Sequence, residues 1–290
     1  MTDALLRQPV RSPAGYAWVR LRRNRTAMLG ATVLLIIAAA CIVGPWFSPF
    51  ALDDVDWDNL QTPPDFGAGH PFGTDANGRD LLVRILIGGR ISLAIGLAAS
   101  LVAVLIGVTW GAVAGYVGGR VDGMMMRAVD VLYALPFMFF VILLMVFFGR
   151  DIYLLFVALG AVSWLDMARI VRGQTLSLKE KDFVRAARAL GTPPLRILAH
   201  HIVPNALGPV VVFATLTVPQ VILFESFLSF LGLGVQEPMT SWGVLISEGA
   251  DVMETAPWML VCPALFLTAT LFSLNFLGDG LRDALDPRDN

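Results

Sequence analysis

Charged residues are scarce in this sequence. Asp, Glu, Lys and Arg make up only 15% of its 290 residues, whereas soluble domains usually carry about 25%. The net charge is −2, which argues against a nucleic-acid partner. There are two cysteines, Cys41 and Cys262, and both lie inside apolar runs. We interpret them as small buried hydrophobic residues rather than as a disulfide.

Sequence signatures of catalysis and of cofactor binding are also missing. The chain has no Gly-x4-Gly-Lys-[Ser/Thr] loop to cradle the phosphates of ATP. His200 and His201 are adjacent, so on a helix their side chains point about 100° apart, and no third metal ligand is near them in the sequence. No Ser/His/Asp or Cys/His set is evident. We therefore expect no catalytic, metal-binding or cofactor-binding residue on this chain.

Long apolar runs dominate instead. Hydrophobic residues make up 56% of the chain, and the mean hydropathy is +0.70. A bilayer core about 30 Å thick needs roughly 20 helical residues, and backbone groups in lipid must bond within their own segment. The first run ends in Gly-Pro-Trp-Phe-Ser-Pro and is too long for a signal peptide. We predict an all-α membrane protein with six transmembrane helices, at about 28–47, 91–117, 124–148, 152–170, 207–231 and 258–277.

Two prolines interrupt these runs, and the charges between the runs set the orientation. Pro136 and Pro219 each free a backbone carbonyl and should kink their helices. The tail 1–27 holds six arginines, and segment 169–205 holds seven basic residues against two acidic ones. Because basic loops stay in the cytoplasm, we expect both tails, 1–27 and 281–290, and the 169–205 loop on that side.

The acidic segments are then outside. Segment 48–90 carries seven Asp against three Arg, and 235–256 carries four acidic residues and no basic one. We expect 48–90 to form an external cap over a pore mouth. Leu81, Leu82 and Ile85 recur at helical spacing, so the cap should end in an interfacial helix that leads into the second span at 91.

The long cytoplasmic loop 171–206 has a specific local pattern. Ser177 and Glu180 have the spacing of a capping box, with Ser177 as N-cap. Gly191 fits the left-handed stop of a helix. Thr192-Pro193 can open a second helix, since proline suits the first helical position. We predict a helix, a Gly turn and a second helix that runs to about His201 and is ended by Pro204.

The first of these helices has two faces. One face is apolar and small, and we expect it to allow close approach to another surface. The other face is charged. On residues alone, the hairpin could equally lie on lipid headgroups. The apolar face holds Phe183, Ala186, Ala187 and Leu190, and the charged face holds Asp182, Arg185 and Arg188.

Ionisable residues inside predicted spans are costly and usually face a cavity or a partner. Glu225 lies in the fifth span, and we expect it either to line a substrate pathway or to be hydrogen-bonded between helices. Asp130 has Arg127 three residues before it, and Asp166 has Arg169 three residues after it. We interpret both as local ion pairs along one helix.

The hairpin also resembles the coupling motif of binding-protein-dependent ABC importer permeases. That motif reads Glu-Ala-Ala, three residues, Gly, nine residues, Ile, one residue, Leu-Pro. Arg185 stands in the usual place of Glu, and His201 and Val203 stand in the places of Ile and Leu. The residues that match at the right spacing are Ala186, Ala187, Gly191 and Pro204.

Further stretches are similar to the dipeptide, oligopeptide and nickel permeases of that family. Residues 163–177 are particularly similar to the C-type subunits of oligopeptide importers. The other similar stretches are His70–Asp80, Ser226–Gly234, Ser241–Gly243 and Asn275–Pro287.

The resemblance implies a type I ABC importer permease in the cell inner membrane, with its permease core at 91–280. It implies that the chain forms half of an oligopeptide pathway in a heterodimer with a second homologous permease. ATP and Mg would be bound by two ATPase subunits, and a periplasmic or lipid-anchored binding protein would deliver the peptide. The resemblance also implies coupling to the ATPase by Asp182, Phe183, Arg185, Ala186, Ala187, Arg188, Gly191 and Pro204.

Other functions stay open at this point. A dipeptide or nickel importer would share these motifs. A stand-alone proton-coupled carrier would use Asp130 and Glu225 as relays, but it would not need the cytoplasmic hairpin. An intramembrane protease would need paired catalytic residues, and only isolated carboxylates are present.

Overall fold

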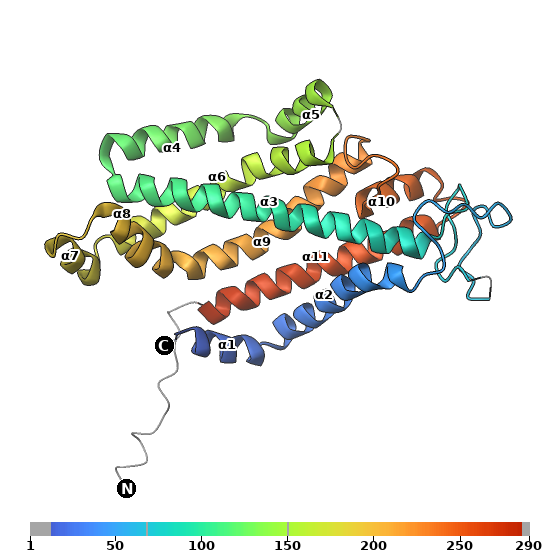
Figure 1. Ribbon diagram of the computed structural model, residues 1–290, viewed down its shortest axis with the longest axis horizontal. Coiled ribbons are helices and arrows are strands. Elements are labelled where there is room, and N and C mark those ends of the chain that lie inside the picture. Colours follow the sequence, from blue (N-terminus) through green and yellow to red (C-terminus); the bar gives the residue numbers. More distant parts are fainter. Residues whose placement is uncertain (1–12, 68, 150, 286–290) are drawn as a thin grey trace, which may run out of the picture.

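The protein is an elongated bundle of long helices (Figure 1). The computed structural model describes residues 13–67, 69–149 and 151–285, so the ends of both predicted tails lie outside the described residues. Apart from two isolated β-bridges in the segment after the first span, the described residues form only helices, turns and loops. This confirms the all-α prediction.

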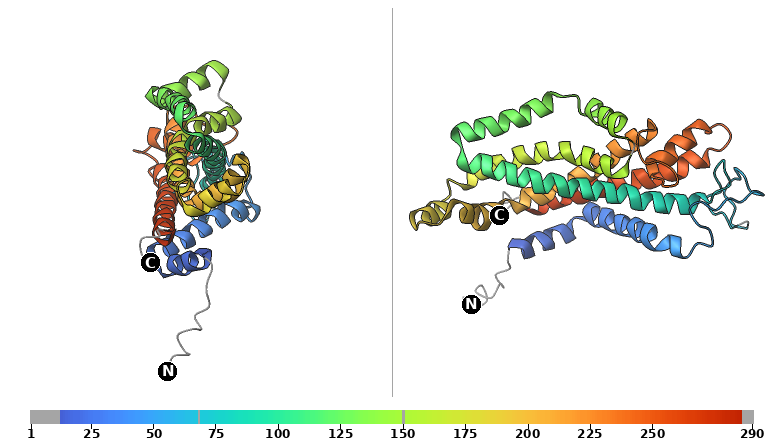
Figure 2. Two further views of the ribbon diagram at one scale, coloured as in Figure 1. Left: turned by 90° about the vertical axis from the view of Figure 1, so that its left-hand side faces the viewer. Right: turned by 45° about the horizontal axis from the view of Figure 1, so that its top comes forward.

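The N-terminal helices lie along the last helix. α1 (Pro13–Arg23) and α2 (Arg25–Val43) are separated by Asn24, whose side chain accepts a hydrogen bond from the backbone N–H of Ala27 at 3.1 Å and caps α2. A short 3₁₀ turn, Gly44–Trp46, follows. α2 packs against α11 (Trp258–Leu285), and the two helices lie side by side in Figures 1 and 2.

The second span is longer than predicted. α3 (Leu81–Val117) is a single helix of 37 residues, so the helix predicted at the end of the cap is present, but it runs into the second span without a break, and the boundary at 91 is wrong. Its N-cap is Asp80, whose carboxylate accepts from the N–H of Val83 at 2.8 Å. Gly88 and Gly89 do not break the helix, because the backbone of Ser241 and the ring of Trp242 pack directly against them.

The third predicted span is a bent pair. α4 (Gly119–Ala134) and α5 (Phe137–Phe148) meet at an angle of 77°. The bend falls at Pro136, as predicted, and the preceding Leu135 is extended because an αR conformation is disfavoured before proline. In Figure 2 α4 and α5 run along the edge of the bundle. Five described helices are long and apolar enough to span a membrane, or six if the bent pair is one span.

The centre of the bundle is built from three helices. α6 (Ile152–Leu178) packs along α3, and α9 (Val203–Phe230) crosses both. Gly107, Gly111 and Gly115 stand four residues apart on α3, and a side chain at any of them would collide with α6. Small residues at this spacing let two membrane helices approach closely. α9 continues through Pro209 and Pro219.

Short helices occupy the two ends of the bundle. α7 (Asp182–Ala189) and α8 (Pro194–Ile197) form a hairpin at one end. The external segment and α10 (Trp242–Asp251) lie at the other end (Figure 1). The predicted cytoplasmic hairpin and the predicted external cap are therefore separated by the length of the spans.

Candidate functional site

The hairpin between α6 and α9 begins later than its sequence pattern indicates. Ser177 lies inside α6, and the N-cap of α7 is Lys181, whose side chain makes no capping bond. The predicted capping box is therefore wrong. Glu180 instead accepts from Nη2 of Arg185 at 3.0 Å, and this bond lowers the pKa of Glu180. α6 runs on because Lys179 reaches α3, where its Nζ donates to the carbonyl of Gly115 at 2.9 Å.

The turn after α7 confirms the prediction for Gly191. Its φ is +76°, a conformation that is costly for residues with a Cβ. The N–H of Gly191 donates to the carbonyl of Arg188 at 3.0 Å, and the N–H of Thr192 donates to that of Ala187 at 3.1 Å. These two bonds form a Schellman motif. The geometry of the hairpin is thus fixed at one glycine.

The second arm of the hairpin differs from the prediction. α8 begins at Pro194, but Pro204 does not end a helix. A π-helical turn, Leu198–Ile202, carries the chain directly into α9, with the N–H of Val203 bonded to the carbonyl of Leu198. A wider turn accommodates the missing N–H of Pro204 near the start of α9. The hairpin is therefore continuous with a membrane helix.

α7 has an inner and an outer face. Val184 and Ala187 are buried against Ile197 and Ile202, so Ala187 does not belong to the outer surface. The outer apolar face, which we define as Phe183, Ala186, Leu190 and Leu195, is open to solvent. Phe183 is 43% exposed, Leu190 85% and Leu195 77%.

Glu225 lies in the interior. Its side chain is fully buried, and it accepts from the hydroxyl of Ser229 at 2.6 Å and from that of Ser92 at 3.1 Å. Ser92 also accepts from the N–H of Trp242 at 3.3 Å. The cluster joins α3, α9 and α10, as the hydrogen-bonded alternative predicts. A role for Glu225 in a substrate pathway stays a prediction.

The other membrane carboxylates pair across helices rather than along one. Asp130 of α4 accepts from Nη2 of Arg169 of α6 at 2.8 Å. Asp166 of α6 accepts from the hydroxyl of Tyr133 of α4 at 2.9 Å. The predicted pairs of Asp130 with Arg127 and of Asp166 with Arg169 are wrong, because the nearer partners stand on the neighbouring helix.

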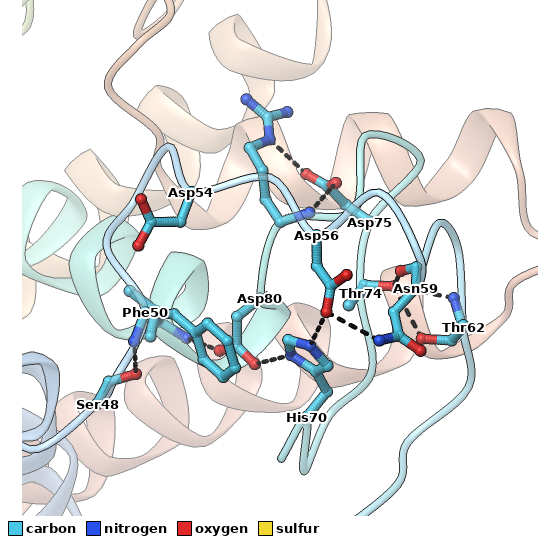
Figure 3. A network of polar contacts seen from close by, with 12 residues as sticks. Ser48, Phe50, Asp54, Asp56, Asn59, Thr62, His70, Thr74, Asp75 and Asp80 are labelled. Atoms are coloured by element: carbon cyan, nitrogen blue, oxygen red, sulfur yellow. Dashed lines mark hydrogen bonds and ion pairs between the residues drawn. The ribbon is translucent and has the colours of Figure 1, made fainter. Parts of the chain in front are cut away.

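The external segment is held by a buried histidine (Figure 3). His70 contacts Asp80 through Nδ1 at 2.8 Å and Asp56 through Nε2 at 3.4 Å. Its ring stacks on Phe50 with 4.5 Å between centroids. The amide of Asn59 donates to Asp56 at 2.8 Å, and this bond, with others from the backbone and His70, lowers the pKa of Asp56. Since Asp80 is the N-cap of α3, the cap is tied directly to a span.

A second set of ionic contacts ties the cap to α10. Arg84 of α3 is 98% buried, and its guanidinium bonds Asp75 at 2.5 Å and Glu248 at 2.7 and 3.0 Å. Arg79 contacts Asp75 and, at 3.0 Å, Glu237. No local pattern in the sequence indicated these contacts. Their only signal was the excess of acidic residues over three arginines in segment 48–90.

The helical bundle, with a helix hairpin at one end and a cap at the other, belongs to a known class of membrane protein. Residues 107–289 match the family described as "Binding-protein-dependent transport system inner membrane component". This match covers more than half of the chain, and the chain belongs to that family. It is therefore the membrane component of an ABC transporter and not the ATPase. Residues 12–64 match the "N-terminal TM domain of oligopeptide transport permease C".

Individual relatives show which members of this family the chain is similar to. The chain is 60% identical to "Oligopeptide transport system permease protein OppC" of Escherichia coli (strain K12), over 93% of this chain and 89% of the relative. It is 46% identical to the OppC protein of Bacillus subtilis (strain 168), over 94% and 88%. It is also 40% identical to "Glutathione transport system permease protein GsiD" of Shigella flexneri, over 96% and 92%.

A solved structure has a similar fold. A chain of the MetNI methionine ABC transporter, in an inward-facing conformation, superposes with a TM-score of 0.57 at 20% identity. The match covers 71% of this chain and 96% of that chain. At this identity the likeness concerns the fold alone.

Proposed function

We propose that this chain is the C-type permease subunit of an oligopeptide ABC importer. It forms one half of the translocation pathway in the inner membrane, beside a second homologous permease. We infer six spans of the type I arrangement, with both termini and the α7–α8 hairpin in the cytoplasm and the cap outside. The observation that carries the proposal is the outer apolar face of the hairpin, at the basic end of a chain that is 60% identical to an oligopeptide permease.

The outer apolar face fits an ATPase partner better than lipid. Exposed apolar side chains mark a protein or membrane contact, and the hairpin stands at the end of the bundle, beyond the middle of the spans (Figure 1), which favours a protein partner. The hairpin is connected to α6 on one side and to α9 on the other. A displacement of the hairpin would therefore be transmitted to two membrane helices. We infer that two ATPase subunits hold ATP and Mg, and that one docks here. Asp182, Arg185, Arg188 and Gly191 shape this contact.

The opposite end fits a binding protein. The cap and α10 are joined by Arg84, Asp75 and Glu248, so they form one rigid external surface. A periplasmic or lipid-anchored protein that delivers peptide would dock there. The substrate assignment rests on the oligopeptide relatives. A dipeptide importer is the second candidate, because the chain is also 45% identical to the dipeptide permease DppC of Bacillus subtilis.

Copurification and reconstitution test the proposal together. Tagged chain, purified from its native membrane, should bring with it a second permease and ATPase subunits. In proteoliposomes, the complex should import peptides only with ATP and loaded binding protein, and longer peptides should compete better than dipeptides. If the chain instead purifies alone and carries substrate when driven by a proton gradient, it is a stand-alone carrier.

A further inference from the structure

A cavity of about 390 Å³ lies among three membrane helices. α4 and the bend before α5 form one wall, and α6 and α9 form the others. Most of the lining is apolar, and the polar groups come from Tyr133, Ser163, Asp166, Thr217 and Gln220. The apolar lining is Leu132, Leu135, Phe137, Val162, Leu165, Phe213, Leu223 and Phe224.

Two of the polar groups in the cavity have spare hydrogen-bonding capacity. Oδ1 of Asp166 accepts from the Tyr133 hydroxyl at 2.9 Å. Within the described ranges, Oδ2 of Asp166 and the side-chain amide of Gln220 have no hydrogen-bond partner. The hydroxyls of Ser163 and Thr217, by contrast, donate to carbonyls of their own helices. Asp166 therefore offers one fixed oxygen and one free oxygen to the cavity.

Of the described residues that line the cavity, Asp166 alone is charged. Arg169 pairs with Asp130 at 2.8 Å, and its guanidinium lies over the ring of Tyr133, 4.3 Å from the centroid. These two charges cancel, and Asp166 remains. The tyrosine thus lies between the ion pair and the carboxylate, where it holds Asp166 in place.

The depth of this cluster indicates which way it faces. Asp166 lies about 20 Å from either end of α6, within the predicted fourth span at 152–170. Arg169 is 42% exposed and Asp130 is 64% exposed, although charges at this depth are strongly disfavoured in lipid. From Ala39 of α2 onward and in the central part of α3, in contrast, the exposed residues of these two helices are apolar, and the exposed polar residues of α2 (Arg25, Thr26 and Thr32) lie in its first half. The face with the cavity is therefore turned toward water or protein.

We propose that this cavity is a peptide-contact site and that the free oxygen of Asp166 takes the α-ammonium group of the passing peptide. The inference rests on the proposed function. Every linear peptide carries an ammonium group, and moving it into a low-dielectric cavity is costly without a compensating charge. Asp166 supplies that charge within the span, while the apolar walls accept side chains of many kinds. Tyr133 is a positioning residue for Asp166.

A pair of variants tests this assignment in the complete transporter. Asp166→Asn removes the carboxylate that lines the cavity, and the double variant Asp130→Asn/Arg169→Gln removes the neighbouring ion pair, which does not line the cavity. Hydrogen bonds to charged groups change binding by roughly tenfold or more, so Asp166→Asn should lower peptide uptake about tenfold. ATP hydrolysis stimulated by loaded binding protein should persist, since docking is untouched. Asp130→Asn/Arg169→Gln removes a pair whose charges cancel, so it should keep uptake within about twofold of the unmodified protein.

Equal losses of uptake in Asp166→Asn and in the double variant would overturn the contact, because only Asp166→Asn removes a group that lines the cavity. Unchanged uptake with Asp166→Asn would overturn it as well. Failure of the unmodified complex to import peptide would instead overturn the proposed function. The inference and the function on which it rests can thus fail separately.

A cross-linking measurement decides the matter if Asp166→Asn fails to assemble. Ser163→Cys lines the cavity, and Leu97→Cys on α3 is exposed outside it. Both are placed in a chain whose Cys41 and Cys262 are replaced by Ala. A peptide with a free ammonium group and a thiol-reactive first side chain should label Ser163→Cys during ATP-driven import and leave Leu97→Cys unlabelled. Equal labelling, or labelling of Leu97→Cys alone, would overturn the site.

Discussion

Arg172 of α6 binds both carboxylate oxygens of Asp122 near the start of α4. Nε donates to Oδ1 at 2.6 Å and Nη2 donates to Oδ2 at 2.7 Å. The pair stands next to the α3–α4 turn, and Arg172 lies six residues before the end of α6 at Leu178. It fixes the base of α4 to α6, whereas the other end of α4 leads into the bend at Pro136.

This ion pair should contribute measurably to stability. Bidentate Arg–carboxylate contacts are stronger than single ones, but Arg172 keeps about a third of its side chain exposed. We expect Asp122→Asn to lower the free energy of unfolding by about 1–2 kcal/mol. A double-mutant cycle with Arg172→Gln, followed by thermal unfolding in detergent, measures the coupling. The exposed pair of Arg185 and Glu180 is the control, and it should contribute less than about 0.5 kcal/mol.

Close packing of α3 on α6 leads to a second prediction. A Cβ at Gly111 would collide with the carbonyl oxygen of Ala168, whereas one at Gly123 of α4 meets nothing within 4 Å. Gly111→Ala should therefore force the two helices apart and lower the yield of folded protein. Gly123→Ala should stabilise its helix by roughly 0.5–1 kcal/mol. Equal melting temperatures of the two variants would contradict this helix packing.

The buried cluster around Glu225 gives a third prediction. Ser229→Ala removes a 2.6 Å hydrogen bond from a fully buried carboxylate and should cost about 1–3 kcal/mol of stability. The hydroxyl of Ser163 bonds only its own helix, so Ser163→Ala should cost far less. Relative uptake of cationic and anionic peptides should stay unchanged with Ser229→Ala. A shift in that ratio at full stability would instead support Glu225 as a pathway residue.

The sequence predicted the parts of the fold that depend on local signals. Long apolar runs located the spans, Pro136 located the bend, and Gly191 located the turn. The predicted capping box at Ser177 failed because Lys179 and Thr175 make tertiary contacts with α3 that extend α6. An N-cap residue contributes about 1 kcal/mol to the stability of its helix. The tertiary contacts of Lys179 and Thr175 with α3 outweigh this contribution.

The ionic contacts of the cap and of the membrane helices were less predictable, because they join residues that are distant in the sequence. Asp130 and Arg169 are 39 positions apart, and Arg84 and Glu248 are 164 apart. Spacing rules along one helix cannot find such pairs. The hydroxyl of Tyr133, which holds Asp166, had no distinguishing pattern in the sequence.

The orientation of the chain gives a fourth prediction. Asp54 is exposed in the cap and Leu190 is exposed on the hairpin, at opposite ends of the bundle. In intact cells with a permeable outer envelope, an impermeant thiol reagent should label Asp54→Cys at once. It should label Leu190→Cys only after the inner membrane is opened. The reverse pattern would place the hairpin outside and would contradict docking to an ATPase there.

The most direct test of the account is made at Gly191, because the hairpin's function depends on its geometry. No atom lies within 4 Å of a Cβ at this position, so only the backbone conformation limits substitution. Asparagine tolerates positive φ, but valine does not. Gly191→Asn should therefore behave like the unmodified protein, and Gly191→Val should misplace α8 relative to α7.

The measurement is peptide uptake together with ATP hydrolysis stimulated by loaded binding protein, in complexes of equal yield. With Gly191→Val we predict that uptake falls at least about tenfold and that the stimulation is lost, since a shift of roughly 1–2 kcal/mol or more separates the two variants. Both activities should persist with Gly191→Asn. A Gly191→Val complex that assembles normally and keeps full stimulated hydrolysis and uptake would contradict the role of this hairpin in coupling.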